Sequence, residues 1–200
     1  MQIVPIKNFW SLNVDEALVA FELKNKPFKK KNYEVFFPVN AQSEGIDLIL
    51  LNKNTKKTVT IQVKGSKPYG PPDYEDKNHV KGGYGAWFNV PKEPTKITDF
   101  FVLVVSTPKS SLKRKAILKS DYLVIPTSKI IEIRRRNKKS KMWSEKQLHL
   151  FFYGEGKSKK AEVQCKKEKK SGIDLSQYLN KSGWNLIKKE INRKNEEKKH

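Results

Sequence analysis

The most regular pattern of apolar and polar residues in the chain lies between residues 46 and 64. Residues 46–51 form a short apolar run, and residues 52–57 are polar, as expected of a turn. In residues 58–64 apolar and polar side chains alternate, which is the period of a strand with one buried face. The pattern therefore predicts a β-hairpin, and the polar face of its second strand consists of Thr58, Thr60, Gln62 and Lys64.

Helical spacing of apolar residues occurs near both ends of the chain. Residues 14–23 show it directly after Asn13, a residue type that favours the N-cap position. Glu16 then stands three residues after the cap, where a capping box would use it. Residues 175–191 repeat the helical spacing with an interruption at Gly183. We expect a helix at each place, and we expect the second helix to pack on the core.

Short apolar segments between these two regions predict further strands at residues 33–39, 86–90, 100–106 and 121–125. The segment at 100–106 is apolar enough for the centre of a sheet. Trp87 is expected in the core rather than on a base-stacking surface. Pro126 and the two residues after it give start signals for a short helix through Ile133. Residues 67–85 are rich in Pro and Gly and predict a long loop, of a kind that is often functional.

The composition changes after residue 133. Residues 134–170 contain two dense runs of Lys and Arg on either side of an apolar, aromatic patch at residues 148–153. This arrangement predicts a β-hairpin or an extended arm with basic ends. The simpler interpretation is a solvated insertion, and the functional one is a grip on the DNA backbone, which is favoured because two like-charged runs repel unless a polyanion joins them. We expect one α/β core over residues 1–133, a basic aromatic insertion or arm over 134–170, a helical segment over 171–191 and a polar tail over 192–200.

The charge balance is strongly basic, because 42 Lys and Arg against 21 Asp and Glu give a formal charge of +21. Such an excess favours a polyanionic partner, since each neutralised phosphate releases counterions. DNA is the leading interpretation, and a solvated surface or anionic lipids are the alternatives. One cysteine and three histidines exclude a zinc finger by ligand count. The chain has neither a secretory-signal pattern nor a membrane-spanning apolar run, so we expect a cytoplasmic protein with no membrane partner.

Polar side chains at one end of the predicted hairpin suggest a cation site. If the hairpin is symmetric about residues 54–55, Asp47 lies opposite Gln62 with Cβ atoms roughly 5 Å apart. Asp47 is a hard oxygen ligand, Gln62 or the backbone carbonyl of Val63 offers a second, and Lys64 would hold an anion beside the ion. The simpler interpretation is that Asp47 only ends a turn and that Gln62 and Lys64 form the solvent face of a strand.

Asp47, fourteen intervening residues and then Gln62-Val63-Lys64-Gly65 resemble the PD-(D/E)xK nuclease superfamily, the restriction-endonuclease-like fold, with Gln in the (D/E) position. Residues 14–23 resemble the first helix of that fold, which in many members carries a Glu that joins the metal site. The match falls on Glu16, with Glu22 second. Residues 99–105 and 121–126 resemble later core strands, so that the resemblance covers roughly residues 14–128.

The resemblance implies an α/β fold with a mixed central β-sheet flanked by helices, and metal-dependent endonucleolytic hydrolysis of DNA. The ligands of Mg²⁺, or of Mn²⁺ in its place, would be Asp47, Gln62, the Val63 carbonyl and Glu16. Lys64 would orient or help to deprotonate the attacking water, or it would stabilise the developing negative charge. Glu16 has a competing role in the capping box. Cleavage of both strands by one assembly would call for a homodimer.

Basic and aromatic residues outside the hairpin are candidate nucleic-acid contacts, namely Lys67, Lys81, Tyr84, Arg134, Arg135, Arg136, Lys138 and Lys139. His79 is a candidate general base, although a lone loop histidine is more often structural. A non-catalytic nucleic-acid-binding module on the same fold is the second hypothesis, and it is favoured by the neutral Gln62. An RNA-binding protein is a third, but no RNP1-type motif supports it. Only the nuclease hypothesis predicts that removing Asp47 abolishes cleavage while binding persists.

Overall fold

The computed structural model describes residues 13–25, 28, 32–38, 45–69, 84–90, 97–110, 116–137, 147–153, 159–163 and 173–193. A five-stranded sheet with the order β1-β2-β3-β5-β6 forms its centre. The strands are β1 (Tyr33–Phe36), β2 (Leu48–Asn52), β3 (Thr58–Ser66), β5 (Phe100–Ser110) and β6 (Ala116–Pro126). Neighbouring strands are antiparallel except β3 and β5, which are parallel. The predicted α/β class with a mixed central sheet is therefore confirmed.

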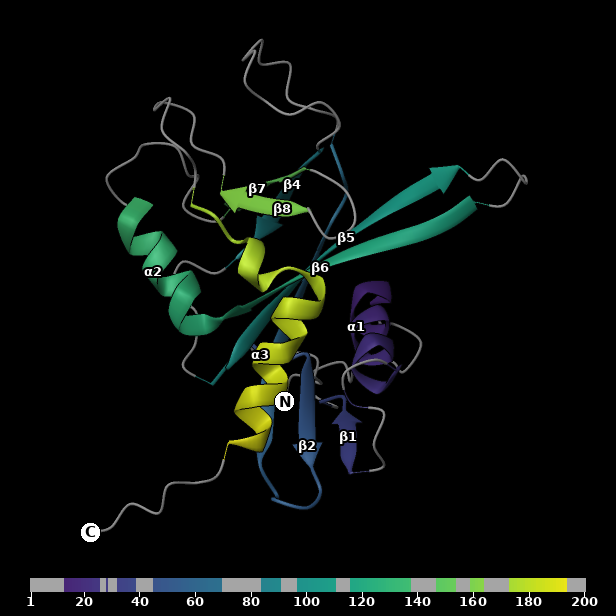
Figure 1. The fold of residues 1–200 in the computed structure, drawn as a ribbon, viewed down its shortest axis with the longest axis vertical. Coiled ribbons are helices and arrows are strands. Elements are labelled where there is room, and N and C mark those ends of the chain that lie inside the picture. Colours follow the sequence, from purple (N-terminus) through teal and green to yellow (C-terminus); the bar gives the residue numbers. More distant parts are fainter. Residues whose placement is uncertain are drawn as a thin grey trace, which may run out of the picture.

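A second, smaller antiparallel sheet consists of β4 (Tyr84–Asn89), β7 (Gln147–Tyr153) and β8 (Lys160–Val163), in that order. Figure 1 shows it above the lower strands of the central sheet. Alternate residues of these strands, such as Phe88, Leu150 and Phe152, are fully buried in one cluster with Phe101 and Leu103 of β5. The predicted basic hairpin is thus present as β7 and β8. Both strands belong to the core rather than to an extended arm, because their inner faces are apolar.

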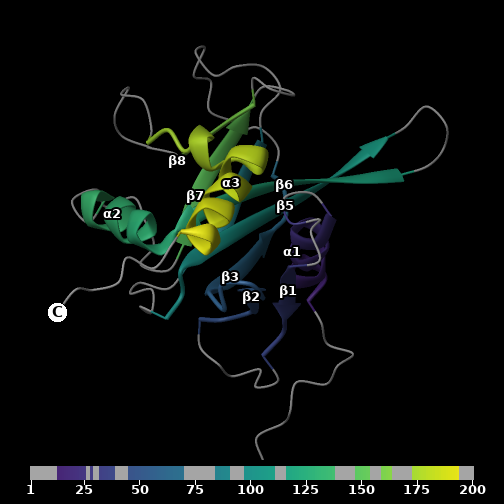
Figure 2. The ribbon, with the colours of Figure 1, turned by 60° about the horizontal axis from the view of Figure 1, so that its bottom comes forward.

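Three helices flank the central sheet, and in both views α1 (Val14–Asn25) and α2 (Thr127–Asn137) lie on opposite sides of the long β5–β6 pair (Figures 1 and 2). α1 and α3 (Asn180–Asn192) share a core cluster with Val102 of β5. α2 and the small sheet share the other cluster, with Leu103. Residues 100–105 of β5 are buried on both faces, so this part of the strand lacks a polar face, as predicted for a central strand. No helix in the described parts is both long and apolar enough to cross a bilayer.

The helix starts explain two further features of the sequence. Asn13 Oδ1 accepts a hydrogen bond from the Asp15 backbone N–H at 3.2 Å, so the predicted N-cap of α1 is confirmed. The predicted interruption at Gly183 is wrong, since α3 runs unbroken through it after a short 3-10 turn, η3 (Ser176–Tyr178). A Cβ on Gly183 would lie 2.1 Å from the Tyr178 carbonyl oxygen. Glycine is therefore needed for the close approach of this turn rather than for a break in the helix.

Candidate functional site

The β2–β3 hairpin has the register that the sequence predicts. Leu48 pairs with Ile61 in the antiparallel ladder. The pairing of the strands is therefore symmetric about residues 54–55. The regular ladder ends at Leu48, because the Asp47 N–H donates to the Ile61 carbonyl rather than to that of Gln62. Asp47 adjoins Leu48 and Gln62 adjoins Ile61, so the carboxylate and the carboxamide belong to the same end of the hairpin.

The turn of this hairpin is closed by a side chain. Asn52 Oδ1 accepts hydrogen bonds from the backbone N–H groups of Asn54 (3.1 Å) and Thr55 (3.4 Å). Lys56 then adopts a positive φ of 58°, which completes the reversal. Asn52 Nδ2 donates to Oδ1 of Asn192 at the end of α3 (3.1 Å), so that the C-terminal helix holds the turn in place.

Asp47 lies one residue before β2, and both its backbone and its side chain form hydrogen bonds to β3. Its backbone N–H donates to the Ile61 carbonyl at 2.9 Å, and its Oδ2 accepts from the Val63 N–H at 2.7 Å. The preceding turn depends on Gly45, whose φ of 94° is readily available to glycine. The buried Thr98 hydroxyl donates to the Gly45 carbonyl. These bonds fix the position of the carboxylate beside β3.

Gln62 is the unusual residue of this hairpin. It is only 7% exposed, and its Oε1 is a buried acceptor without a hydrogen-bond partner among the residues that the structure describes. The N–H and C=O of one strand residue point the same way, so the Val63 carbonyl also points toward the side where β2 has ended. A carboxylate, an amide oxygen and a backbone carbonyl thus gather at this end of β3. Such hard oxygen donors suit Mg²⁺, which also retains several waters, and a cation would satisfy the orphaned amide oxygen.

Lys64 follows Gln62 on the same face, but Glu16 does not. Side chains of β3 alternate: Ile61 and Val63 belong to the core cluster that includes α1, and Gln62 and Lys64 point to the opposite face. Glu16 is buried on α1 and so lies on the other side of the strand. The prediction that Glu16 joins Asp47, Gln62 and Lys64 is not supported by this arrangement, because α1 packs through its apolar residues on the face away from Gln62.

The acidic residues of α1 have a different environment. A Cβ on Gly65 would lie 1.7 Å from Asp15 Oδ2, so the carboxylate of Asp15 sits directly against this glycine. Burial raises the pKa of Asp15. The pKa of Tyr122 on β6 is raised as well, by burial first and then by the charges of Glu22 and Asp15. The sequence analysis did not single out Asp15. The feature of the sequence that pointed to a close neighbour here is Gly65, the glycine that follows Lys64. The described residues hold no group of three or more Asp, Glu, His or Cys side chains arranged for a metal.

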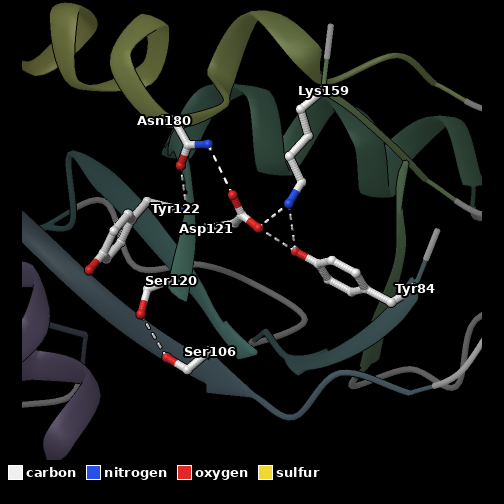
Figure 3. Close-up of polar contacts among 7 residues, drawn as sticks. All are labelled: Tyr84, Ser106, Ser120, Asp121, Tyr122, Lys159 and Asn180. Carbon is white, nitrogen blue, oxygen red and sulfur yellow. Dashed lines mark hydrogen bonds and ion pairs between the residues drawn. The ribbon is translucent and has the colours of Figure 1, made fainter. Parts of the chain in front are cut away.

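A buried polar cluster lies between the central sheet and the small sheet (Figure 3). Asp121 of β6, 1% exposed, accepts hydrogen bonds from the Tyr84 hydroxyl (2.6 Å), from Lys159 Nζ and from Asn180 Nδ2 (3.1 Å). Asn180 Oδ1 also accepts from the Tyr122 backbone N–H at 2.9 Å. The cluster therefore ties β4, β6, the residue before β8 and the start of α3 to one carboxylate.

The protonation states of the cluster follow from these contacts. Burial alone would raise the pKa of Asp121, but hydrogen bonds from Lys159, Tyr84 and Asn180 and the charge of Lys159 together lower it. Burial raises the pKa of Tyr84 far above its usual value, and the hydrogen bond to Asp121 and its charge raise it further. An ionised carboxylate paired with a lysine and a neutral tyrosine is thus the stable state. In the sequence, Asp121 stands out only as a polar residue at the start of an apolar segment, so its role in this cluster could not be predicted.

Two of the predicted nucleic-acid contacts have structural roles instead. Tyr84 donates to Asp121 and stacks on Phe152 with ring centroids 5.1 Å apart, because it belongs to the sheet interface. Arg134 donates from Nη2 to the Val90 carbonyl and is partly buried, which lowers its pKa. Lys67 is exposed, and its contact with nucleic acid stays a prediction. The side chains of Arg135 and Arg136, and the whole of Lys81, Lys138, Lys139 and His79, lie outside the described residues.

Trp87, expected in the core, is 38% exposed on the outer face of the small sheet. The error arose from the weak alternation of β4, which gives little indication of the buried face.

Comparisons of the chain with protein-family models, curated proteins and solved structures find no match. The site is therefore judged on its own residues.

Proposed function

We infer that the protein is a metal-dependent endonuclease of the PD-(D/E)xK type that hydrolyses DNA phosphodiester bonds at the end of the β2–β3 hairpin. The observation that carries this proposal is the buried Oε1 of Gln62, which has no hydrogen-bond partner among the described residues and belongs to the residue before Val63, whose N–H binds the Asp47 carboxylate. A mixed sheet with this hairpin beside a parallel strand is compatible with the restriction-endonuclease-like core. The formal charge of +21 supports a polyanionic substrate. A cytoplasmic location and a homodimer that cuts both strands are part of the proposal.

The residues divide the work as follows. Asp47, Gln62 and the Val63 carbonyl would hold Mg²⁺ or Mn²⁺ through oxygen atoms. When bound, the ion would supply Lewis-acid stabilisation of negative charge on the phosphate. Lys64, on the same face as Gln62, would donate hydrogen bonds to the phosphate oxygens and keep the scissile bond next to the carboxylate. Lys64 would also position the attacking water.

Cleavage of supercoiled plasmid tests the proposal. Asp47→Asn is the sharpest variant, because an amide oxygen still accepts from the Val63 N–H while the charge needed for the cation is lost. Wild type should nick or linearise the plasmid with Mg²⁺ or Mn²⁺ and not with EDTA. Asp47→Asn and Lys64→Met should be inert yet still bind DNA, and Lys53→Met, an exposed lysine in the turn of the hairpin, should cut normally. Cleavage by Asp47→Asn at the wild-type rate would refute the assignment.

A non-catalytic nucleic-acid-binding module is the second candidate. It is favoured by the hydrogen bond from the Val63 N–H to Asp47, which gives the carboxylate a purely structural use, and by the position of Glu16 on the opposite side of β3. In that case wild type binds DNA with a steep salt dependence and never cuts it with any divalent metal. Asp47→Asn would then change neither binding nor stability by much, because its acceptor remains.

A further inference from the structure

An exposed tryptophan stands on the outer face of the small sheet. Trp87 of β4 pairs with His149 of β7, and their rings stack with centroids 3.7 Å apart and planes within 7°. Gly85 leaves room for this arrangement, since a Cβ there would lie 3.0 Å from His149 Nε2. The imidazole thus supports one face of the indole. A large apolar ring held in this way and still 38% exposed is typical of a binding surface rather than of a core residue.

On the side away from β7, the backbone of β4 adjoins residues 66–69. β4 is the edge strand of the small sheet, and His149 covers the indole from the β7 side. On the other side, Tyr69 and Gly85 exchange two backbone hydrogen bonds of 2.9 and 3.1 Å in an antiparallel bridge. Toward Trp87 the bridge does not continue as a ladder, because the Trp87 N–H donates to Ser66 Oγ, and the Ser66 hydroxyl donates to the Lys67 carbonyl at 3.1 Å. Lys67 is thus next to the residue that holds the Trp87 backbone. Lys67 and Tyr69 are both exposed, and both belong to the segment that runs beside β4 on this side.

This position lies close to the candidate active site. The Trp87 backbone N–H donates to Ser66 Oγ at 3.1 Å. Ser66 follows Lys64 by two residues, or roughly 6–7 Å along an extended strand. A nucleotide stacked on Trp87 would therefore be a close neighbour of a phosphate held at Lys64.

The segments of sequence that flank β7 and β8 are also basic. Residues 138–146, which lead into β7, contain four lysines and one glutamate, and residues 164–172, which follow β8, contain four lysines and one glutamate. An aromatic platform next to positive charge is how proteins bind single strands, because every base has a π-face and every nucleotide a phosphate. Duplex DNA offers no unstacked base to such a ring.

We propose that Trp87, supported by His149, stacks on a base of single-stranded DNA, with Lys67 contacting a neighbouring phosphate. The substrate is accordingly DNA with unpaired nucleotides next to the scissile bond, such as a flap, gap or splayed junction, rather than continuous duplex. This inference rests on the proposed DNA substrate. It concerns binding, however, and does not require the Asp47 site to be catalytic.

Fluorescence anisotropy with a labelled 15-nucleotide oligo-dT and a matched duplex, both in EDTA, tests the platform. Trp87→Leu should weaken single-strand binding about tenfold or more, because base stacking on one aromatic ring is worth about that much. Trp87→Phe, which keeps a ring, should recover most of the affinity. Phe21→Leu removes an exposed aromatic ring from α1, far from the small sheet in sequence, and should change nothing. Lys67→Met should weaken binding and lower its salt dependence.

The outcomes separate this inference from the proposed nuclease activity. Loss of single-strand affinity in Trp87→Leu with an unchanged melting temperature and unchanged duplex binding supports the platform, even if wild type never cuts. Unchanged single-strand affinity in Trp87→Leu overturns it, even if the plasmid is cleaved with metal and Asp47→Asn is inert. An equal loss for Trp87→Leu and Trp87→Phe also overturns it, because stacking would then not be the cause.

Discussion

Replacing Gln62 with methionine should make the protein more stable and less active at once. Methionine has a similar length and shape, but it removes the buried Oε1 that lacks a partner. An unsatisfied buried acceptor costs about 1–3 kcal/mol, so Gln62→Met should raise the free energy of unfolding by about 1–2 kcal/mol in EDTA. For a chain of 200 residues this corresponds to a rise in melting temperature of roughly 2–8 °C.

Thermal unfolding with and without Mn²⁺ provides the assay. Wild type should gain stability as Mn²⁺ is added, since an ion that binds only the folded state shifts the unfolding equilibrium. Gln62→Met should be more stable than wild type in EDTA and should show little response to the metal. Gln62→Glu, which keeps an oxygen donor and adds charge, should be less stable in EDTA and respond more strongly. A Gln62→Met variant that is less stable than wild type in EDTA would refute the reasoning, because the amide would then be making bonds that stabilise the fold.

The buried cluster allows two further predictions. Asp121→Ala leaves Lys159, whose side chain is 10% exposed, without its carboxylate, and should lower the free energy of unfolding in urea by about 3–5 kcal/mol. The double variant Asp121→Ala, Lys159→Met should recover much of this loss. A loss below about 1 kcal/mol in Asp121→Ala alone would contradict this. The folded-state pKa of Tyr84 is raised, so its contribution to stability is complete below pH ~10 and is lost above it. Tyr84→Phe should therefore flatten the alkaline limb of the stability profile, and an unchanged limb would exclude this role.

Local patterns in the sequence predicted the hairpin and most strands because each was encoded by neighbouring residues. The alternation in residues 58–64 defines the buried face of β3, and a turn centred on residues 54–55 sets the pairing of Leu48 with Ile61. Asn13 likewise marked the start of α1 through its own capping bond. Predictions of this kind need only information carried by adjacent residues.

Contacts between distant segments could not be read in the same way. The bond between Lys159 and Asp121 joins residues 38 positions apart and exists only because the small sheet packs on β5 and β6. The face of β3 on which α1 packs is also set by tertiary contacts. This packing places Glu16 on the side of β3 away from Gln62. The exposure of Trp87 could not be predicted for the same reason, since the exposed and the buried face of β4 differ only once the strand pairs with β7.

Titration of Mn²⁺ by calorimetry would test most directly the claim that the hairpin end is a cation site. Wild type should bind one ion per chain at the site, and Asp47→Asn should bind it at least tenfold more weakly. Asp99→Asn is the matched control, because Asp99 Oδ2 accepts from the Thr60 N–H of the same strand at 2.8 Å just as Asp47 does from Val63. Binding to this control should equal that of wild type. If wild type binds no Mn²⁺, or if Asp47→Asn binds it as tightly as wild type, the hairpin end is not a metal site and the carboxylate only closes the strand.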